Sequence, residues 1–373
     1  MTSKERMMRA LAREKPDRLP VTIHQWQQYH LDTCLGGRDA LGAFQTCGLD
    51  ASLQYFEAMG QFWIPNAEKY IVQTPEWREE IAVVKDDPDD KLLHHTITTP
   101  GGRLAYQTGG NRTTTWITEY LIKRHEDVEL IEKYLPVAKL NREAIAAEYD
   151  RLGDAGILRG FVWGDQAGCW QHACCLMAEE QLILECHDHP DWVHRLLRTL
   201  LARKLRFIEE SLAGAKFDLI ETGGGAGSDT VISPRLHCEF CLPYDRQMHD
   251  ALHRLGHRTT YHTCGGMMHL LDLIIQNGTD ASETLAPPGV GGNITEPDKV
   301  RAVFGGKVAM IGGMDQFNIL TCGTKEDIRR ETHRLFAGFG RNGGYVCSAS
   351  DHFFDTPVEN LRAFANAAKE CVF

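Results

Sequence analysis

The chain has 373 residues, of which 43% are hydrophobic, and its formal net charge is −11 with histidine counted as neutral. This acidic balance argues against binding to nucleic acid or to an anionic membrane surface, because either needs a clustered excess of Lys and Arg. Small molecules or another protein are the expected ligands, and the length allows either one large α/β barrel or two ordinary domains.

The chain begins with a short amphipathic helix. Thr2 and Glu5 have the spacing of a capping box, and Pro16 ends the helix. This region lacks the apolar core of an export signal, and every apolar run in the chain is far shorter than the roughly 20 residues that cross a bilayer. We therefore expect a cytoplasmic protein whose twelve cysteines are free thiols or metal ligands.

Eight short runs of β-type residues recur along the chain, and each is followed by a turn and a helical pattern. The runs are residues 19–23, 50–56, 156–163, 217–221, 258–263, 279–284, 307–312 and 344–349. The helical patterns include residues 178–213, 234–256, 266–276 and 324–341. Eight alternations of strand and helix predict an α/β fold, a (β/α)8 TIM barrel.

Residues 80–122 interrupt this alternation. Apolar and polar residues alternate there around Asp/Pro and Gly/Gly turns, which predicts an antiparallel β meander inserted after the second barrel strand. No internal repeat, low-complexity tract or flexible linker divides the sequence. We expect residues 1–373 to form a single barrel domain with this insertion.

Polar residues able to do chemistry follow most of the predicted strands. Active sites of such barrels lie at the carboxyl ends of the strands, so this concentration indicates an enzyme. The alternative to an active site is that these residues are polar only because strand ends always meet polar loops. The residues are His24, Glu57, Asp165, Glu221, His262, Cys264, Glu283, Asp315, Cys347, Asp351 and His352.

The segment "YHTCGG" at the end of the fifth predicted strand contains a His-x-Cys pair. In an extended chain both side chains of His262 and Cys264 point to the same side, and Gly265 and Gly266 give the chain freedom to turn away. Zinc accepts imidazole together with thiolate, and a catalytic zinc site keeps one position open for substrate. The pair alone is a weak signal, because a buried free cysteine beside a hydrogen-bonded histidine is common.

A third ligand would make a zinc site more specific. Cys347, near the end of the eighth strand, is the first candidate, and His352 competes with it. Glu221, on the neighbouring fourth strand, could supply the fourth ligand when no substrate is bound. Cys347 could instead be a small residue of the core.

Five segments together resemble the uroporphyrinogen decarboxylase superfamily, over most of the chain and in the same order. They are "TSKERMMRALAREKPDRLPV", "FDLIETGGGAGSDTVISPRLHCEFCLPY", "YHTCGG", "VAMIGGMDQFNIL" and "DTPVENLRAF". Within that superfamily the His-x-Cys resembles the zinc motif of the cobalamin-dependent methyltransferases. The resemblance implies a (β/α)8 barrel with zinc on His262, Cys264 and a later cysteine. The usual place of that cysteine falls nearer Ser350 than Cys347, so the third ligand stays open among Cys347, His352 and a carboxylate.

The decarboxylase branch of the superfamily is the alternative. It meets a polycarboxylate substrate with an arginine-rich stretch after the first strand. Here that stretch is "HQWQQYHLDTCLGG", with no arginine before Arg38. A lyase acting without metal on a small carboxylated substrate therefore fits less well than a methyltransferase, and a barrel that only binds a small ligand is the third possibility.

We interpret the chain as a zinc-dependent methyltransferase. Zinc can lower the pKa of a substrate thiol or polarise a methyl ether oxygen. Glu221 would be a displaceable ligand or a proton-handling group, and His24 and Asp165 would support catalysis. The expected substrate contacts are Glu283, Asp315, His352, Trp26 and Trp163.

The substrate and partner are also predicted. Tryptophans near the ends of the first three strands could form an aromatic pocket, which would favour a methoxylated or otherwise methylated small molecule over a thiol. The corrinoid (cobalamin) is expected on a separate protein, because the chain lacks the Asp-x-His-x-x-Gly loop of corrinoid-carrying domains.

Overall fold

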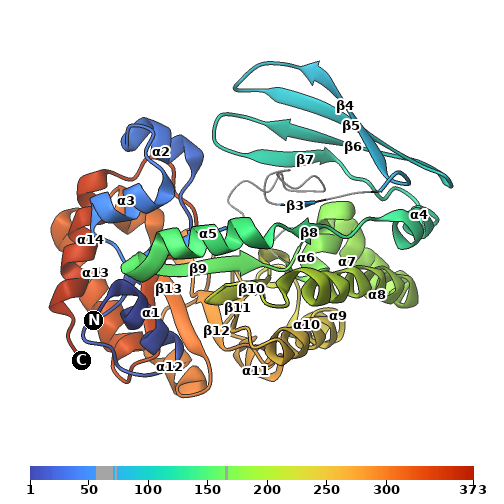
Figure 1. Cartoon of the computed structure of the whole chain (residues 1–373). Helices are drawn as coiled ribbons and strands as arrows, with labels where there is room; N and C mark the ends of the chain where they lie inside the picture. Colours follow the sequence, from blue (N-terminus) through green and yellow to red (C-terminus); the bar gives the residue numbers. More distant parts are fainter. Residues whose placement is uncertain (56–69, 72–73, 164–166) are drawn as a thin grey trace.

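A computed structural model describes residues 1–55, 70–71, 74–163 and 167–373. Its centre is an eight-stranded, entirely parallel sheet in the order β1-β14-β13-β12-β11-β10-β9-β2 (Figure 1). The strands are β1 (Val21–Thr22), β2 (Ala51–Gln54), β9 (Gly156–Phe161), β10 (Leu219–Gly223), β11 (Thr259–His262), β12 (Ala281–Thr284), β13 (Ala309–Met314) and β14 (Tyr345–Ala349).

The two edge strands, β1 and β2, meet and close the barrel. Asp50, just before β2, donates its backbone N–H to the carbonyl of Val21 in β1 at 2.8 Å. The Asp50 side chain also accepts from the Val21 N–H at 3.0 Å. The predicted (β/α)8 barrel is therefore confirmed, with all eight strands at their expected places.

Helices surround the sheet, and prolines divide two of the helical stretches predicted as continuous. Residues 178–213 form two helices that separate at Pro190, and residues 234–256 separate near Pro243, because proline lacks the N–H of the helical hydrogen bond. The helices are α1 (Ser3–Leu11), α2 (Gln28–Cys34), α3 (Ala40–Cys47), α4 (Asp127–Tyr134), α5 (Arg142–Leu152), α6 (Cys169–Leu176), α7 (Glu179–Asp188), α8 (Pro190–Phe207), α9 (Pro234–Phe240), α10 (Leu242–Arg254), α11 (Leu271–Gln276), α12 (Pro297–Phe304), α13 (Lys325–Leu335) and α14 (Val358–Glu370).

An antiparallel sheet interrupts the barrel between β2 and β9, as the alternation in residues 80–122 predicted. Its strands are β4 (Arg78–Lys85), β5 (Lys91–Thr99), β6 (Gly102–Gly110) and β7 (Thr115–Glu119), each paired with the next. A short antiparallel pair, β3 (Tyr70–Ile71) with β8 (Lys139–Leu140), lies at its base. Figure 1 shows the four-stranded sheet standing above the barrel, with α4 at its lower right end.

The amino-terminal helix α1 closes the opposite end of the barrel. Thr2 and Glu5 form the predicted capping box. Met7, Ala10 and Leu11 form one apolar cluster with inward-facing residues of β9, β10, β12, β13 and β14, which are Ile157, Leu219, Ala281, Ala309, Ile311 and Val346. Because this end is filled by apolar side chains, the polar interior lies toward the carboxyl ends of the strands.

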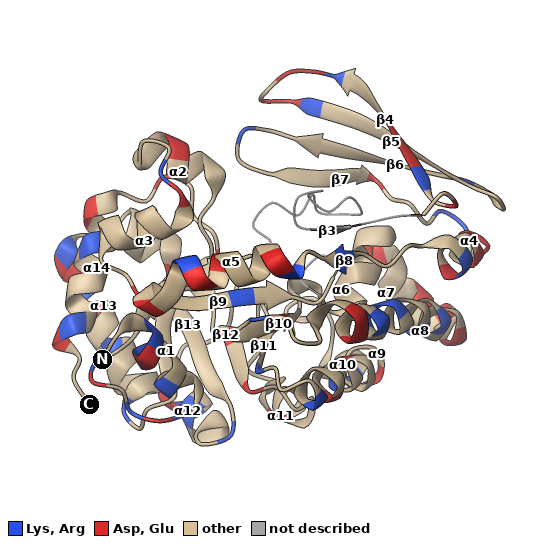
Figure 2. Ribbon diagram, in the orientation of Figure 1, with Lys and Arg blue, Asp and Glu red and all other residues tan. Residues whose placement is uncertain are grey.

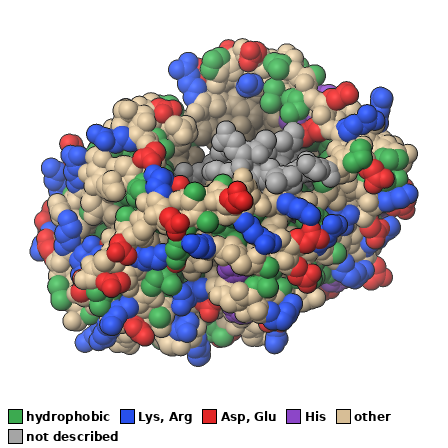
Figure 3. All heavy atoms as spheres, viewed as in Figure 1, with side chains coloured by type: hydrophobic (Ala, Val, Ile, Leu, Met, Phe, Trp, Pro, Cys, Tyr) green, Lys and Arg blue, Asp and Glu red, His purple; other side chains and the backbone are tan. Residues whose placement is uncertain are grey.

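Charged side chains of both signs are interspersed over the outer helices and the antiparallel sheet (Figure 2). The space-filling view shows the same mixture on one face, without a large basic field (Figure 3). This distribution agrees with the acidic net charge and gives no support for a nucleic-acid surface on that face. Among the described residues, no helix has the length and apolar character needed to span a bilayer.

Asp50 joins α1 to the closure of the barrel, and its removal should destabilise the protein. Its buried carboxylate accepts from Arg6 at 2.7 Å, from Ser3 at 2.7 Å and from Arg18 at 3.2 Å. We expect Asp50→Ala to lower the free energy of unfolding by about 3–5 kcal/mol, since it leaves buried donors and charge uncompensated. Urea denaturation measures this loss.

The matched control for Asp50→Ala is Asp150→Ala, which removes an exposed carboxylate that pairs with Lys216. This control should change the free energy of unfolding by no more than about 0.5 kcal/mol. Equal effects of the two substitutions would contradict the role given to Asp50.

Candidate active site at the barrel mouth

The alternation of the strands brings charged side chains into the barrel. Leu219 and Ala281 belong to the interior cluster against α1, and Glu221 and Glu283 lie two residues further along the same strands. A side-chain period of two places them on the same inner face, one layer nearer the carboxyl ends. His262 ends β11, the strand between them, and is fully buried.

Arg159 holds the two carboxylates together. It lies on β9, two residues after the interior residue Ile157, and it is 2% exposed. Its guanidinium donates to Glu221 at 2.7 Å and to Glu283 at 2.6 Å. Arg159 is not among the site residues predicted from the sequence. The available signal was a single charged residue inside the otherwise apolar run "GILRGFVW".

The two carboxyl groups have opposite protonation tendencies. Burial, together with the charge of Glu283, raises the pKa of Glu221 to about 8. Burial would also raise the pKa of Glu283, but the Arg159 guanidinium and the hydrogen bond with His262 outweigh it and hold that pKa well below its ordinary range. The pair therefore favours the proton on Glu221 and the negative charge on Glu283.

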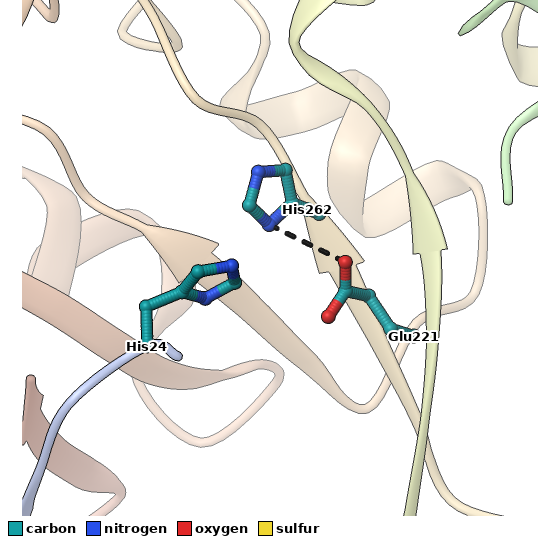
Figure 4. A group of neighbouring side chains, drawn as sticks. All are labelled: His24, Glu221 and His262. Atoms are coloured by element: carbon teal, nitrogen blue, oxygen red, sulfur yellow. Dashed lines mark ion pairs between the residues drawn. The ribbon is translucent and has the colours of Figure 1, made fainter. Parts of the chain in front are cut away.

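His24, Glu221 and His262 converge in the interior, as Figure 4 shows. The Nδ1 atom of His262 lies 3.3 Å from Glu283 and 3.6 Å from Glu221. The rings of His24 and His262 are 4.9 Å apart, and His24 Nδ1 lies 4.0 Å from Glu283. Burial lowers the pKa of His24 to about 3, so this imidazole is neutral.

The His-x-Cys pair meets a carboxylate at the mouth of the barrel. One potential ligand atom from each of His262, Cys264 and Asp351 lies within 4.8 Å of the other two. The Nε2 atom of His262 is buried and makes no hydrogen bond within the described part of the chain. Two other sets of potential ligands adjoin the first, one of His24, Asp351 and His352 and one of His24, Glu221 and His262. An unsatisfied buried nitrogen beside a thiol and a carboxylate fits a divalent cation such as zinc.

The charge around His262 also favours a cation. Burial would lower its pKa, yet the neighbouring Cys264 thiol and the carboxylates of Glu283 and Glu221 raise that pKa well above its ordinary value. Burial would raise the pKa of Asp351, but the nearby rings of His352, His24 and His262 hold it below its ordinary value. The same negative field that retains a proton on His262 would attract a metal ion.

Cys347, the first candidate for the third ligand, lies elsewhere. On β14 Val346 faces the barrel interior, whereas Tyr345, Cys347 and Ala349 pack in the outer cluster between the sheet and the helices. Burial raises the pKa of the Cys347 thiol far above its usual range. Because side chains alternate along β14, Cys347 points away from the barrel interior, and the expectation that it is a zinc ligand is corrected. Of the alternatives left open, the carboxylate of Asp351 is grouped with His262 and Cys264.

The inward position on this part of the chain belongs to Ser350. Its hydroxyl oxygen is buried and without a hydrogen-bond partner among the described residues. His352 lies beside His24 at 5.4 Å between ring centroids, and its Nε2 is 2.9 Å from the Gln25 side-chain oxygen. It therefore stays at the mouth but outside the His262–Cys264–Asp351 group.

Other predicted site residues serve the fold. Trp26 packs on His30, Phe44 and Phe353, and Trp163 is 4% exposed with its ring against His172. These tryptophans fill the outer cluster and do not form the expected pocket. Asp315 caps the following turn, accepting from the backbone N–H groups of Phe317 and Asn318. Glu57 and Asp165 lie outside the described residues.

Comparisons with known proteins identify two kinds of relative. The family model described as uroporphyrinogen decarboxylase (URO-D) matches residues 101–371. A uroporphyrinogen decarboxylase of Pseudoalteromonas atlantica is 30% identical over 187 residues, which cover 48% of each chain. A methylated-thiol–coenzyme M methyltransferase of Methanosarcina mazei is 28% identical over 145 residues, covering 39% of this chain and 36% of the relative. The matched segments thus span half or less of these relatives.

The fold agrees with a solved structure over a longer range. A methyltransferase from Methanosarcina mazei superposes with a TM-score of 0.65 at 16% identity, covering 99% of each chain. At this identity the likeness concerns the fold.

Removing the buried guanidinium should destabilise the barrel strongly. We expect Arg159→Met to lower the free energy of unfolding by about 3–5 kcal/mol, because two buried carboxyl groups lose their shared donor. Adding Glu221→Gln and Glu283→Gln to that variant should recover part of the loss, since fewer buried charges then remain unpaired. Urea unfolding of the three-residue series tests this. An Arg159→Met protein as stable as the parent would contradict the arrangement.

Proposed function

Because the chain belongs to the uroporphyrinogen decarboxylase (URO-D) family, we propose that it is a zinc-dependent methyltransferase that exchanges a methyl group between a small substrate and a corrinoid protein. The supporting observation is the convergence of His262, Cys264 and Asp351 at the carboxyl ends of the strands. An imidazole, a thiol and a carboxylate make three ligands with room for a fourth from the substrate, which is the pattern of a catalytic zinc site.

The relatives support methyl transfer as one of two chemistries. One curated relative is named a methyltransferase and acts, by its name, on methylated thiols, and the solved structure with the same fold is also a methyltransferase. Other relatives are named uroporphyrinogen decarboxylases. Decarboxylation of a small carboxylated substrate without metal is therefore the alternative. The His-x-Cys pair and the arginine-free stretch at residues 24–37 favour methyl transfer.

The metal would be held by His262, Cys264 and Asp351. Bound zinc supplies a positive charge that activates a thiol as thiolate or polarises the oxygen of a methyl ether. The chain's own groups do the remaining work. Arg159 fixes Glu283 as an anion, and the Glu283 carboxylate orients the His262 ring through Nδ1.

Glu221 and His24 are the proton-handling groups of this proposal. The pKa of Glu221 near 8 lets its carboxyl group hold a proton at neutral pH, 3.6 Å from the His262 ring. His24 is neutral and can donate or accept one hydrogen bond toward the space beside Glu283. A group with a pKa near the working pH exchanges protons efficiently, so Glu221 suits protonation of a leaving group or removal of a thiol proton.

The substrate is proposed only as a class. The preference for a methoxylated compound rested on an aromatic pocket, and Trp26 and Trp163 pack in the outer cluster instead. A methylated small molecule, including a methylated thiol, is the donor or acceptor in our proposal. The corrinoid would be presented by a separate protein at the barrel mouth. We also propose that residues 1–373 form a single domain.

Metal analysis of single variants tests the ligand set. We expect His262→Ala, Cys264→Ser and Asp351→Ala each to lose the zinc bound at the barrel mouth, with affinity there lowered by about 10-fold to 100-fold or more. Cys347→Ala should keep its zinc, because that thiol lies in the outer cluster. Elemental analysis after dialysis, with circular dichroism to confirm folding, gives the result. Zinc lost with Cys347 and retained without Asp351 would overturn the assignment.

A second assay tests the reaction. The zinc-loaded protein should transfer methyl groups to reduced cobalamin from at least one member of a panel of methylated thiols, ethers and amines, and Glu221→Gln should slow transfer by about 10²–10⁴-fold without releasing zinc. Carbon dioxide release from porphyrinogens or small carboxylates is measured in parallel. Metal-independent decarboxylation without methyl transfer would establish the alternative instead.

A further inference from the structure

A separate group of potential metal ligands lies in the outer helical layer, around α4, α7 and α8. It consists of His125 before α4, Glu185 in the last turn of α7, and His189 between α7 and α8. One ligand atom from each lies within 4.8 Å of the other two. His125 Nε2 is 2.9 Å from Glu185 Oε2, and the rings of His125 and His189 are 4.8 Å apart in an edge-to-face arrangement.

The three side chains are held by their surroundings. The His125 ring stacks on Trp192 at 4.6 Å, and the Trp192 indole donates to the His125 carbonyl at 3.2 Å. Glu185 is 8% exposed, and its second oxygen accepts from Gln181 at 3.1 Å. The backbone N–H of His189 donates to the Glu185 carbonyl at 2.8 Å, which sets the spacing between these two ligands. Such supporting contacts reduce the cost of ordering ligands around an ion.

The chemistry of the group suits a borderline divalent cation. Two imidazoles and one carboxylate are a common ligand set for zinc, and first-row ions such as Ni²⁺ and Cu²⁺ bind the same donors. Oxygen-seeking ions such as Mg²⁺ and Ca²⁺ fit less well, because only one donor is a carboxylate. His189 is exposed, so an ion can enter from solvent and complete its coordination with water.

We propose that His125, Glu185 and His189 form a second zinc site, distinct from the catalytic one. Its place in the fold indicates a structural role. His125 belongs to the segment that returns from the antiparallel sheet, six residues after β7 ends at Glu119, whereas Glu185 and His189 belong to the α7–α8 pair. The bound ion joins that returning segment to the helical layer of the barrel. This proposal does not depend on the chemistry at the barrel mouth.

Zinc titration in a His262→Ala background tests the second site by itself. The chelator-treated variant should bind about one zinc per chain with saturation, as measured by calorimetry. Zinc should also raise its melting temperature, because a ligand that binds only the folded state stabilises it. Adding His189→Ala should abolish both effects, and this exposed histidine makes no side-chain cap, so the variant should fold.

The matched control is His187→Ala, which removes an exposed histidine of α7 that lies outside the group. It should bind zinc as the His262→Ala parent does. Glu185→Gln, which keeps the shape of the side chain but removes its charge, should weaken zinc binding.

No saturable zinc in the His262→Ala protein would overturn the proposal. Equal losses from His187→Ala and His189→Ala would overturn it too, because they would indicate non-specific surface binding.

Discussion

A buried guanidinium between two buried carboxyl groups organises the interior of this barrel. Arg159 donates to both Glu221 and Glu283, and these groups come from three strands of one parallel sheet. Charges with so little exposure are tolerated only when they are paired and hydrogen-bonded. In this arrangement Glu283 is favoured as the anion and Glu221 as the protonated acid. Both lie beside His262. Without Arg159 the interior would hold uncompensated negative charge beside His262.

The barrel supplies the remaining order of the site. Helix α1 fills one end with apolar side chains, so polar groups gather at the other end, where His262, Cys264 and Asp351 converge. Both activities known among the relatives are compatible with this scaffold, because a fold does not fix a function. Our proposal of methyl transfer rests on the candidate ligand set. A thiol and an imidazole beside a carboxylate are typical ligands of a borderline cation such as zinc. Binding a substrate with many carboxylates would require arginines, and the loop after the first strand has none before Arg38.

The sequence predicted the strands, the inserted sheet and the His-x-Cys pair, because periodicity and strand ends are local signals. It could not place Cys347, since the inward or outward face of β14 is fixed only by neighbouring strands and helices. Arg159 was visible as a charge within an apolar run, but its partners are 62 and 124 residues away. Trp26 and Trp163, near strand ends, were predicted to line a pocket, but both pack in the outer cluster. His125 and Glu185 are 60 residues apart in the sequence, so no local motif indicated that they would meet.

X-ray absorption at the zinc edge reports which atoms bind the metal at the barrel mouth. The sample is the His189→Ala protein with an equal amount of zinc, so that the barrel mouth is the site observed. We expect one sulfur at about 2.3 Å, from Cys264, together with nitrogen and oxygen ligands at about 2.0–2.2 Å. A spectrum without sulfur, or with two sulfur ligands, would contradict a site built from His262, Cys264 and Asp351.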